Sequence, residues 1–408
     1  NKSMILMTES SAMPWDLARN GTEYPIDLGL WMYNKGLSAQ TGITATVDVE
    51  YEGAIIHTNS SSTLSFTAPD TTYRDTQYID LGTYAPVLWN VGTYTITYTI
   101  NNVGDQDTTD NQFSFEFKLT NNEDIYAKCR LDGSNKPMNP TSVTSVFSLT
   151  KDIWEACIAF KNGYAGQRNA NALGMTFSAF PTDSMNGKSV EIKAYKWDDV
   201  FTNIYSPVTY DNLTLLSSTS YMYQNELLEG INIFLPFDNP VSLLDNQRYL
   251  FCLFNNNGYS GLRIGFDNQI DYTSTSDYYL QPIIPLGYTG DEPVIEWYTE
   301  GFGYDYIPAI SVTMDIATSI NENNTDLDII PYPNPVTNLL TIPIRKNIKG
   351  NVLIEIFDLT GKLVLSSTKR LADDPLKINV SSLNNANYIF QLTFSNGSKD
   401  RFKVSVNR

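Results

Sequence analysis

The chain has 408 residues, enough for two or three domains of the usual ~100–200 residues each. Aromatic residues make up 12% of the chain, with 26 Tyr, and charged residues only 18%, a composition that favours strands and predicts an all-β protein with few helices. The formal net charge of −18 repels phosphate backbones and anionic headgroups, so it argues against binding to nucleic acid or to an anionic membrane.

Residues 1–122 are predicted to form an immunoglobulin-like sandwich. Apolar and polar residues alternate strictly over residues 43–51, as in a strand with one buried face. Residues 92–100 alternate in the same way, and the phenylalanines of residues 113–117 are typical of their hairpin partner. With Asn-x-Gly at residues 34–36 and an acidic, Asn-rich loop before the last strand, this segment resembles bacterial adhesion-related modules of the CARDB type.

The acidic loop of residues 101–112 is a candidate cation site. Asp105, Asp107 and Asp110 offer carboxylate oxygens, the ligands that Ca²⁺ prefers. Asp110 stands where an EF-hand loop requires glycine, and Glu116 lies inside a predicted strand, so a helix–loop–helix calcium site is excluded. A looser Ca²⁺ site and an ordinary solvated hairpin loop remain as alternatives. No other cofactor is expected.

Residues 123–317 are predicted to form a jelly-roll-like sandwich. Several apolar or alternating runs are separated by clusters of Asn, Asp, Gly and Pro, as in all-β domains of this type. The runs are residues 175–180, 189–197, 231–237, 249–254, 262–266, 294–298 and 310–314. Residues 318–330 then lose the apolar periodicity and become rich in Asn, Asp and Thr, which predicts a solvated linker.

Aromatic residues on polar strand faces are the candidate ligand-binding residues. Tyr195 and Trp197 share one face of their strand with Glu191 and Lys193, opposite an apolar face. A second group contains Trp297 and Tyr304. Flat rings beside polar groups can stack on a sugar, so these residues predict binding of a glycan or of a surface protein, while burial against a neighbouring strand is the alternative.

Catalysis is not expected. His57 is the one histidine, it ends a short apolar run, and no nucleophile elbow accompanies it. One histidine and three scattered cysteines do not supply a usual zinc site. Glu296 and Glu300 are the remaining candidates for a carboxylate pair that cleaves sugars, against solvated acids at a strand end as the alternative.

The three cysteines allow at most one disulfide within the chain. Cys252 lies in a run that is apolar on both faces, so it is predicted to be a buried free thiol. Cys129 and Cys157 are then the predicted disulfide pair. No run approaches the ~20 apolar residues of a transmembrane helix.

Residues 331–408 are predicted to form a separate small sandwich. Prolines at its start hold the chain extended, so no helix begins there. Alternating apolar residues mark strands at residues 340–344, 352–356 and 388–394, and the Asn-Gly turn within residues 395–397 is of the favoured hairpin type.

Three short motifs are spaced along this C-terminal segment. They contain Pro333, Asn334 and Pro335 in the first, Asp358, Gly361 and Lys362 in the second, and Tyr388 in the third. In this order and spacing they resemble the C-terminal sorting domains, type A-like, of type IX secretion substrates from the Bacteroidota. One departure is Ala386 followed by Asn387 before the tyrosine, where the family usually has glycine; asparagine tolerates the left-handed backbone region.

The resemblance implies an export address and not the role of the cargo. Its partners would be the outer-membrane translocon and the processing machinery at the cell surface, and the protein would be secreted or displayed on the cell surface. Residues 4–7 are too short for the apolar core of a signal peptide, so we expect a mature form or a fragment that lacks its upstream part.

The sequence as a whole predicts an all-β protein of tandem antiparallel sandwiches that is exported by type IX secretion. The two N-terminal domains are predicted to bind or adhere and not to catalyse. The alternative is that they are the accessory and C-terminal part of a larger secreted hydrolase, a protease or a glycosidase.

Overall fold

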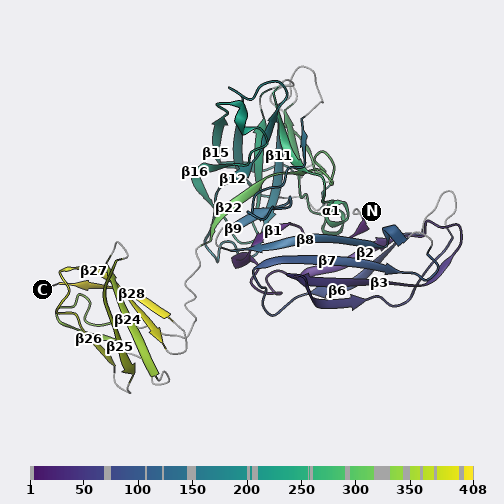
Figure 1. The fold of residues 1–408 in the computed structure, drawn as a ribbon. Coiled ribbons are helices and arrows are strands. Elements are labelled where there is room, and N and C mark those ends of the chain that lie inside the picture. The colour runs from purple at the N-terminus through teal and green to yellow at the C-terminus, as the bar shows by residue number, and fades with distance from the viewer. Residues whose placement is uncertain are drawn as a thin grey trace. The chain divides into compact units, whose positions relative to one another are not determined.

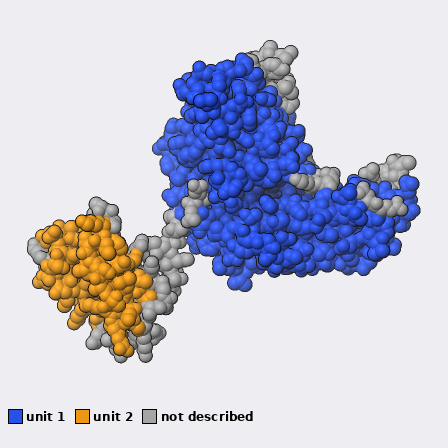
Figure 2. All heavy atoms as spheres, viewed as in Figure 1, with its two compact units in different colours: residues 1–317 blue, residues 318–408 orange. Residues whose placement is uncertain are grey.

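The computed structural model describes residues 4–68, 75–105, 108–121, 124–144, 153–199, 203–204, 210–255, 257, 261–289, 295–316, 331–342, 350–358, 362–371, 375–394 and 399–407. The chain divides into two compact units, residues 1–317 and residues 318–408 (Figure 2). The predicted linker of residues 318–330 and the Asn-Gly turn of residues 395–397 lie outside the described residues.

The prediction of an all-β protein of stacked antiparallel sheets is confirmed, since strands make up 56% of the structure and helices 5%. The described residues contain one α-helix, α1 (Thr273–Tyr279), which ends at Leu280 in the left-handed conformation, with φ of 51°. They include no helix with the length and apolar character needed to cross a membrane. The assignment of each sandwich to the immunoglobulin-like or jelly-roll-like type stays a prediction.

The first part of the N-terminal unit is a two-layer structure. One layer contains β3 (Gln40–Tyr51), β4 (Ala54–Ser60), β5 (Leu64–Phe66), β7 (Gly92–Asn101) and β8 (Gln112–Thr120). The other contains β2 (Ile26–Met32) and β6 (Gln77–Tyr84), and Figure 1 shows the two layers facing each other. The alternation of the sequence places Val47 and Ile96 from the first layer in the buried core, as predicted, and Leu30 from the second layer packs in the same core.

A continuous sheet connects this part to the rest of the unit. β1 (Ala12–Pro14) pairs in parallel with β8 and antiparallel with β9 (Asp124–Ala127). The sheet continues through β22 (Ser311–Ile316), β12 (Ala170–Phe177) and β16 (Ile233–Ser242), which gives ten strands within the described residues. Strands from both sides of residue 122 therefore share one sheet and one apolar core. The division of this unit into two domains at residue 122 stays a prediction.

Two further sheets complete the N-terminal unit. The larger has the order β15 (Leu213–Met222), β14 (Ser189–Trp197), β17 (Arg248–Asn255), β11 (Ile153–Lys161), β19 (Leu286–Thr289) and β20 (Ile295–Tyr298). The smaller contains β10 (Thr141–Val143), β13 (Ala179–Pro181), β18 (Leu262–Asp267) and β21 (Ile307–Pro308). Strands β11 and β17 are central in the larger sheet and bury both faces, which explains why their sequences are nearly continuous apolar runs. β14 alternates between buried and half-buried residues.

The disulfide joins Cys157 to Cys252, and Cys129 is the free thiol. The predicted pair of Cys129 and Cys157, and the predicted free thiol at Cys252, are both wrong. Cys157 in β11 lies directly opposite Cys252 in β17, so their side chains leave the sheet on the same face. Burial raises the pKa of the Cys129 thiol well above its usual range, which makes this thiol unreactive.

The C-terminal unit is a small sandwich of its own. A sheet with the order β25 (Leu363–Leu371), β24 (Gly350–Asp358), β27 (Ala386–Phe394) and β28 (Lys399–Val406) accompanies a pair formed by β23 (Leu339–Ile342) and β26 (Leu376–Asn379). Its core is a separate apolar cluster that includes Ile354, Phe390 and Val404.

Candidate functional site

The structure brings two predicted ligand-binding rings together, but as a covered layer. Trp197 is 0% exposed, so the prediction of an open ring at this position is wrong. Tyr210 stacks on Trp197 with ring centroids 5.0 Å apart, and on its other side on Trp297 with centroids 4.9 Å apart. Trp197 also belongs to the apolar cluster around the Cys157–Cys252 disulfide. Tyr210 therefore covers Trp197. The strand pattern of the sequence did not place residue 210 on this face of the sheet.

Tyr195 is engaged in a buried polar network. Its hydroxyl donates to the carboxylate of Glu155 at 3.2 Å, and Lys193 Nζ lies 3.6 Å from the same carboxylate. Burial raises the pKa of Glu155, and Lys193 partly opposes this effect. Tyr304, the fourth predicted ring, lies half-buried against the main core. These contacts stabilise the sheet, and sequence reasoning missed Glu155 because this residue stands inside an apolar run.

The acidic loop borders a hollow of about 630 Å³ at the open end of the first sandwich. Asp105 and Asp110 line it, whereas Asp107 lies outside the described residues. Lys35 Nζ lies 2.7 Å from Asp110, so an ammonium already neutralises this carboxylate. Within the part of the chain that the structure describes, no three His, Cys, Asp or Glu residues are grouped to hold a metal ion. The calcium site stays a prediction.

The residues considered for catalysis do not line the hollow beside the acidic loop. His57 lies beside Tyr84, with ring centroids 4.9 Å apart. Glu296 is exposed and accepts a hydrogen bond from the Tyr298 hydroxyl at 3.1 Å, and Glu300 is also exposed.

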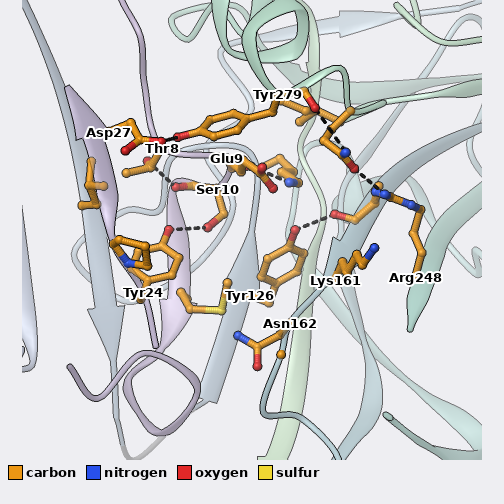
Figure 3. A pocket seen from close by; sticks show the side chains of 18 of the residues that line it. Thr8, Glu9, Ser10, Tyr24, Asp27, Tyr126, Lys161, Asn162, Arg248 and Tyr279 are labelled. Carbon is orange, nitrogen blue, oxygen red and sulfur yellow. Dashed lines mark hydrogen bonds between the residues drawn. The ribbon is translucent and has the colours of Figure 1, made fainter. Parts of the chain in front are cut away.

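The candidate ligand site is a second hollow of about 240 Å³, which we call the junction cavity. It is enclosed by the segment before β1, the loop before β2, strands β9, β11 and β17, and the segment after α1. Its lining includes Glu9, Ser10, Glu23, Tyr24, Asp27, Tyr126, Lys128, Lys161, Asn162, Arg248, Tyr279 and Gln281. Figure 3 shows Ser10, Tyr24 and Asp27 on one side of the cavity and Lys161 and Arg248 on the other, with Glu9 and Tyr126 between them.

Hydrogen bonds and ion pairs fix the walls of the junction cavity. The Tyr279 hydroxyl donates to Asp27 at 3.2 Å, and Asn162 donates to the backbone oxygen of Leu17 at 3.0 Å. Arg168 pairs with Glu23 at 2.9 Å. Each contact joins residues more than a hundred positions apart, so the cavity is held in shape before any ligand arrives.

Lys128 and Glu9 are the unusual groups in this cavity. Lys128 is 3% exposed, donates from Nζ to the backbone oxygen of Glu9, and places Nζ 5.5 Å from the centroid of the Tyr126 ring. Burial lowers the pKa of Lys128 to about 8, although the nearby charge of Glu9 opposes this shift. The carboxylate of Glu9 has no hydrogen bond or ion pair with other described residues. The one sequence signal for this site is a lysine inside the apolar run of residues 125–129.

The three C-terminal motifs meet at one end of the β25–β24–β27–β28 sheet. Tyr388 in β27 lies opposite Asp358 in β24 and opposite Val404 in β28. Asn334 hydrogen-bonds to both neighbours of Val404, since its Nδ2 donates to the oxygen of Lys403 at 3.1 Å and its Oδ1 accepts from the backbone nitrogen of Ser405 at 2.8 Å.

The remaining motif residues complete this row. Asp358 accepts a hydrogen bond from the backbone nitrogen of Lys362 at 3.0 Å and closes the turn from β24 to β25. Gly361, inside that turn, lies outside the described residues. Pro333 and Pro335 flank Asn334 and follow cis peptide bonds. Residues that are far apart in the sequence thus form one continuous row across the sheet, which we call the motif row.

Residues 331–406 match the family model described as the secretion system C-terminal sorting domain. The C-terminal unit is a secretion sorting domain. The match confirms the resemblance seen in the sequence, and it supports export of the chain by type IX secretion and a cell-surface or secreted location. Its motif row consists of the residues that the resemblance pointed to.

The comparisons outside the sorting domain are distant. No curated protein matches the chain. A solved structure described as "Biofilm associated protein - BSP domain" is 9% identical and covers 100% of this chain and 82% of its own, with a TM-score of 0.16. Carbohydrate-binding modules of the β-sandwich superfamily are 11% identical over 59% of this chain and 96% of theirs, with a TM-score of 0.18. At these TM-scores the likenesses carry no argument about ligand or partner.

Proposed function

We propose that the protein is an exported saccharide-binding protein without catalytic activity, in which residues 4–316 bind the ligand and the sorting domain directs export. The junction cavity is the observation that carries this proposal. It combines a carboxylate, an ammonium and side-chain amides with tyrosine rings, and sugars are bound by such polar groups beside rings. Its volume of about 240 Å³ is below the ~300–1,000 Å³ that encloses drug-sized ligands, so it suits a single sugar ring.

The junction cavity supports this proposal better than the open-end hollow. In that larger hollow the rim side chains already bond one another: Asn102 donates to Gln40 at 3.3 Å, and Lys35 pairs with Asp110. In the junction cavity, the carboxylate of Glu9 is available to accept a hydrogen bond from a sugar hydroxyl. Binding of a glycan at the cell surface would make the protein an adhesion or capture module.

The sorting domain supports a finer proposal about export. The protein would pass the outer membrane through the type IX translocon, and surface processing machinery would then remove the sorting domain by cleavage between the two units. The translocon and that machinery would be its transient partners, and a surface glycan its lasting one.

A saccharide screen by calorimetry with the full chain tests the binding proposal. We expect a monosaccharide to bind, and we expect Glu9→Ala to weaken it about tenfold or more, since a hydrogen bond to a charged group contributes about 1.5–3 kcal/mol. Glu229→Ala removes an exposed carboxylate outside the cavity and serves as the matched control. Hydrolysis of the bound sugar, or affinity that is equal in both variants, would contradict the proposal.

A further inference from the structure

The junction cavity contains a buried ammonium that no carboxylate contacts. Lys128 is 3% exposed, and its Nζ has one hydrogen-bond acceptor among the described residues, the backbone oxygen of Glu9. An ammonium carries three N–H donors, so two of them remain available. A buried charge is normally paired, because removal from water without a partner is strongly unfavourable.

The other charged groups with buried heads at this cavity are paired within the protein. Arg248 forms an ion pair with Asp199 at 2.6 Å, and Arg168 forms one with Glu23 at 2.9 Å. Asp27 accepts hydrogen bonds from the hydroxyls of Tyr279 and Thr83. Lys128 differs from its neighbours, since the charge of Glu9 is near it but no carboxylate of the described residues contacts its ammonium.

We propose that the ligand of the junction cavity is an acidic sugar whose carboxylate binds to Lys128. This inference rests on the proposed function and specifies the class of saccharide. The ring of Tyr126 lies beside the ammonium, and the carboxylate of Glu9 accepts a hydroxyl of the same sugar.

The charges around the cavity favour a monoanion over a phosphate monoester, which carries nearly two negative charges at neutral pH. Glu9, Glu23 and Asp27 line the same hollow, and the whole chain carries a formal charge of −18. A doubly charged group would be repelled by these carboxylates more strongly than a single carboxylate. Uronic acids, in which the sugar ring carries one carboxylate, meet this requirement.

Calorimetric titration of the full chain with D-glucuronate, its methyl ester and D-glucose tests the inference. We expect glucuronate to bind at least tenfold more tightly than the ester or glucose, since both have the same ring but lack the negative charge. Lys128→Met, close to lysine in length, should weaken glucuronate at least tenfold and remove most of its advantage over the two neutral sugars. Lys136→Met, outside the cavity, has the same change in charge and should bind like the wild type.

The outcomes separate this inference from the proposed function. Equal affinity of the wild type for all three sugars would overturn the role of Lys128 and leave saccharide binding intact. Absence of binding for all three would overturn both. If Lys128→Met does not fold, as judged by circular dichroism, the comparison of acid and ester on the wild type still decides, because it needs no variant.

Discussion

The two units of this protein have cores of different chemistry. In the sorting domain, Gln391 is the one buried polar residue among those described, and its Nε2 donates to Glu355 at 2.7 Å. The N-terminal unit buries Lys128, Glu155 and Arg248 together with many hydroxyl groups. A unit that serves as an address requires only a stable shape, which apolar packing supplies. The N-terminal unit holds charges in its interior, which lowers its stability, and under the proposed function these charges provide sites for a ligand.

The largest expected effect is on export. Deletion of residues 331–408 should reduce the secreted protein to background while residues 1–317 remain folded, because the two units have separate cores. Fractionation of the cells, with immunoblotting of the periplasm and the medium, measures the first part, and a melting curve of the retained protein measures the second. Undiminished secretion would contradict the role of the sorting domain as the export signal. Loss of the melting transition would contradict the independent folding of the N-terminal unit.

The next effect concerns the disulfide and should be confined to the N-terminal unit. Replacement of both Cys157 and Cys252 by Ala opens a loop with a sequence separation of 95 residues, and closure of a loop of this size contributes about 4 kcal/mol. Calorimetry of the full chain should show the transition of the N-terminal unit at a lower temperature and that of the sorting domain unchanged. Cys129→Ala is the control with a small effect. A shift of both transitions would show that the units unfold together.

Lys128→Met should change stability in the opposite direction. Burial lowers the pKa of Lys128 from 10.5 to about 8, so the charged lysine destabilises the folded N-terminal unit by about 3 kcal/mol at neutral pH, and its removal should recover most of that. Denaturant unfolding at pH 7 measures this gain. A loss of stability would show that the hydrogen bond to Glu9 outweighs the burial of the charge.

The pH dependence of the same pair of proteins provides a second test. Between pH 8 and about 10 the unfolded chain binds more protons at Lys128 than the folded chain does, so wild-type stability should rise with pH in this window. Lys128→Met should lack this rise. Denaturant unfolding at several pH values would show it, and parallel curves for the two proteins would contradict the lowered pKa.

The smallest effect is expected in the sorting domain. Ile354→Val removes one methyl group from its apolar core and should lower the stability of this unit by about 1 kcal/mol. Secretion should remain at the wild-type level, since residue 354 is not in the motif row. Calorimetry and a secretion assay measure the two quantities. A secretion defect with this mild variant would mean that export is sensitive to stability and not only to the motif row.

The sequence predicted local structure and the sorting domain, and it failed where strands from distant parts of the chain become neighbours. The alternation in β3 and β7 decides which residues face the core, so Val47 and Ile96 were placed correctly. Cys157 and Cys252 pair because β11 and β17 are adjacent, and no local pattern encodes that adjacency. Burial of Trp197 has the same origin, because Tyr210 stacks on it from another segment and Trp297 stacks on the other side of Tyr210.

The junction cavity could not be predicted from local sequence patterns, because it too is formed by segments that are distant in the chain. Its residues come from the first strands, the centre of the unit and the segment after α1, and apart from Lys128 none of them is unusual in its local sequence. The sorting motifs could be found because the family pattern lists them together, even though the fold is what makes them neighbours.

The family resemblance assigns the export signal to the motif row, and this row exists only in the folded sorting domain. Asn334, Asp358 and Tyr388 are separated by tens of residues along the chain, and they come into line only when β24, β27 and β28 are paired in the correct register. A one-residue slip of β28 would move Asn334 away from its two backbone partners and turn the side chains of the strand to the opposite face. A receptor that binds the whole row would therefore select chains whose C-terminal sheet is complete. Chains with a misfolded sorting domain would not be exported.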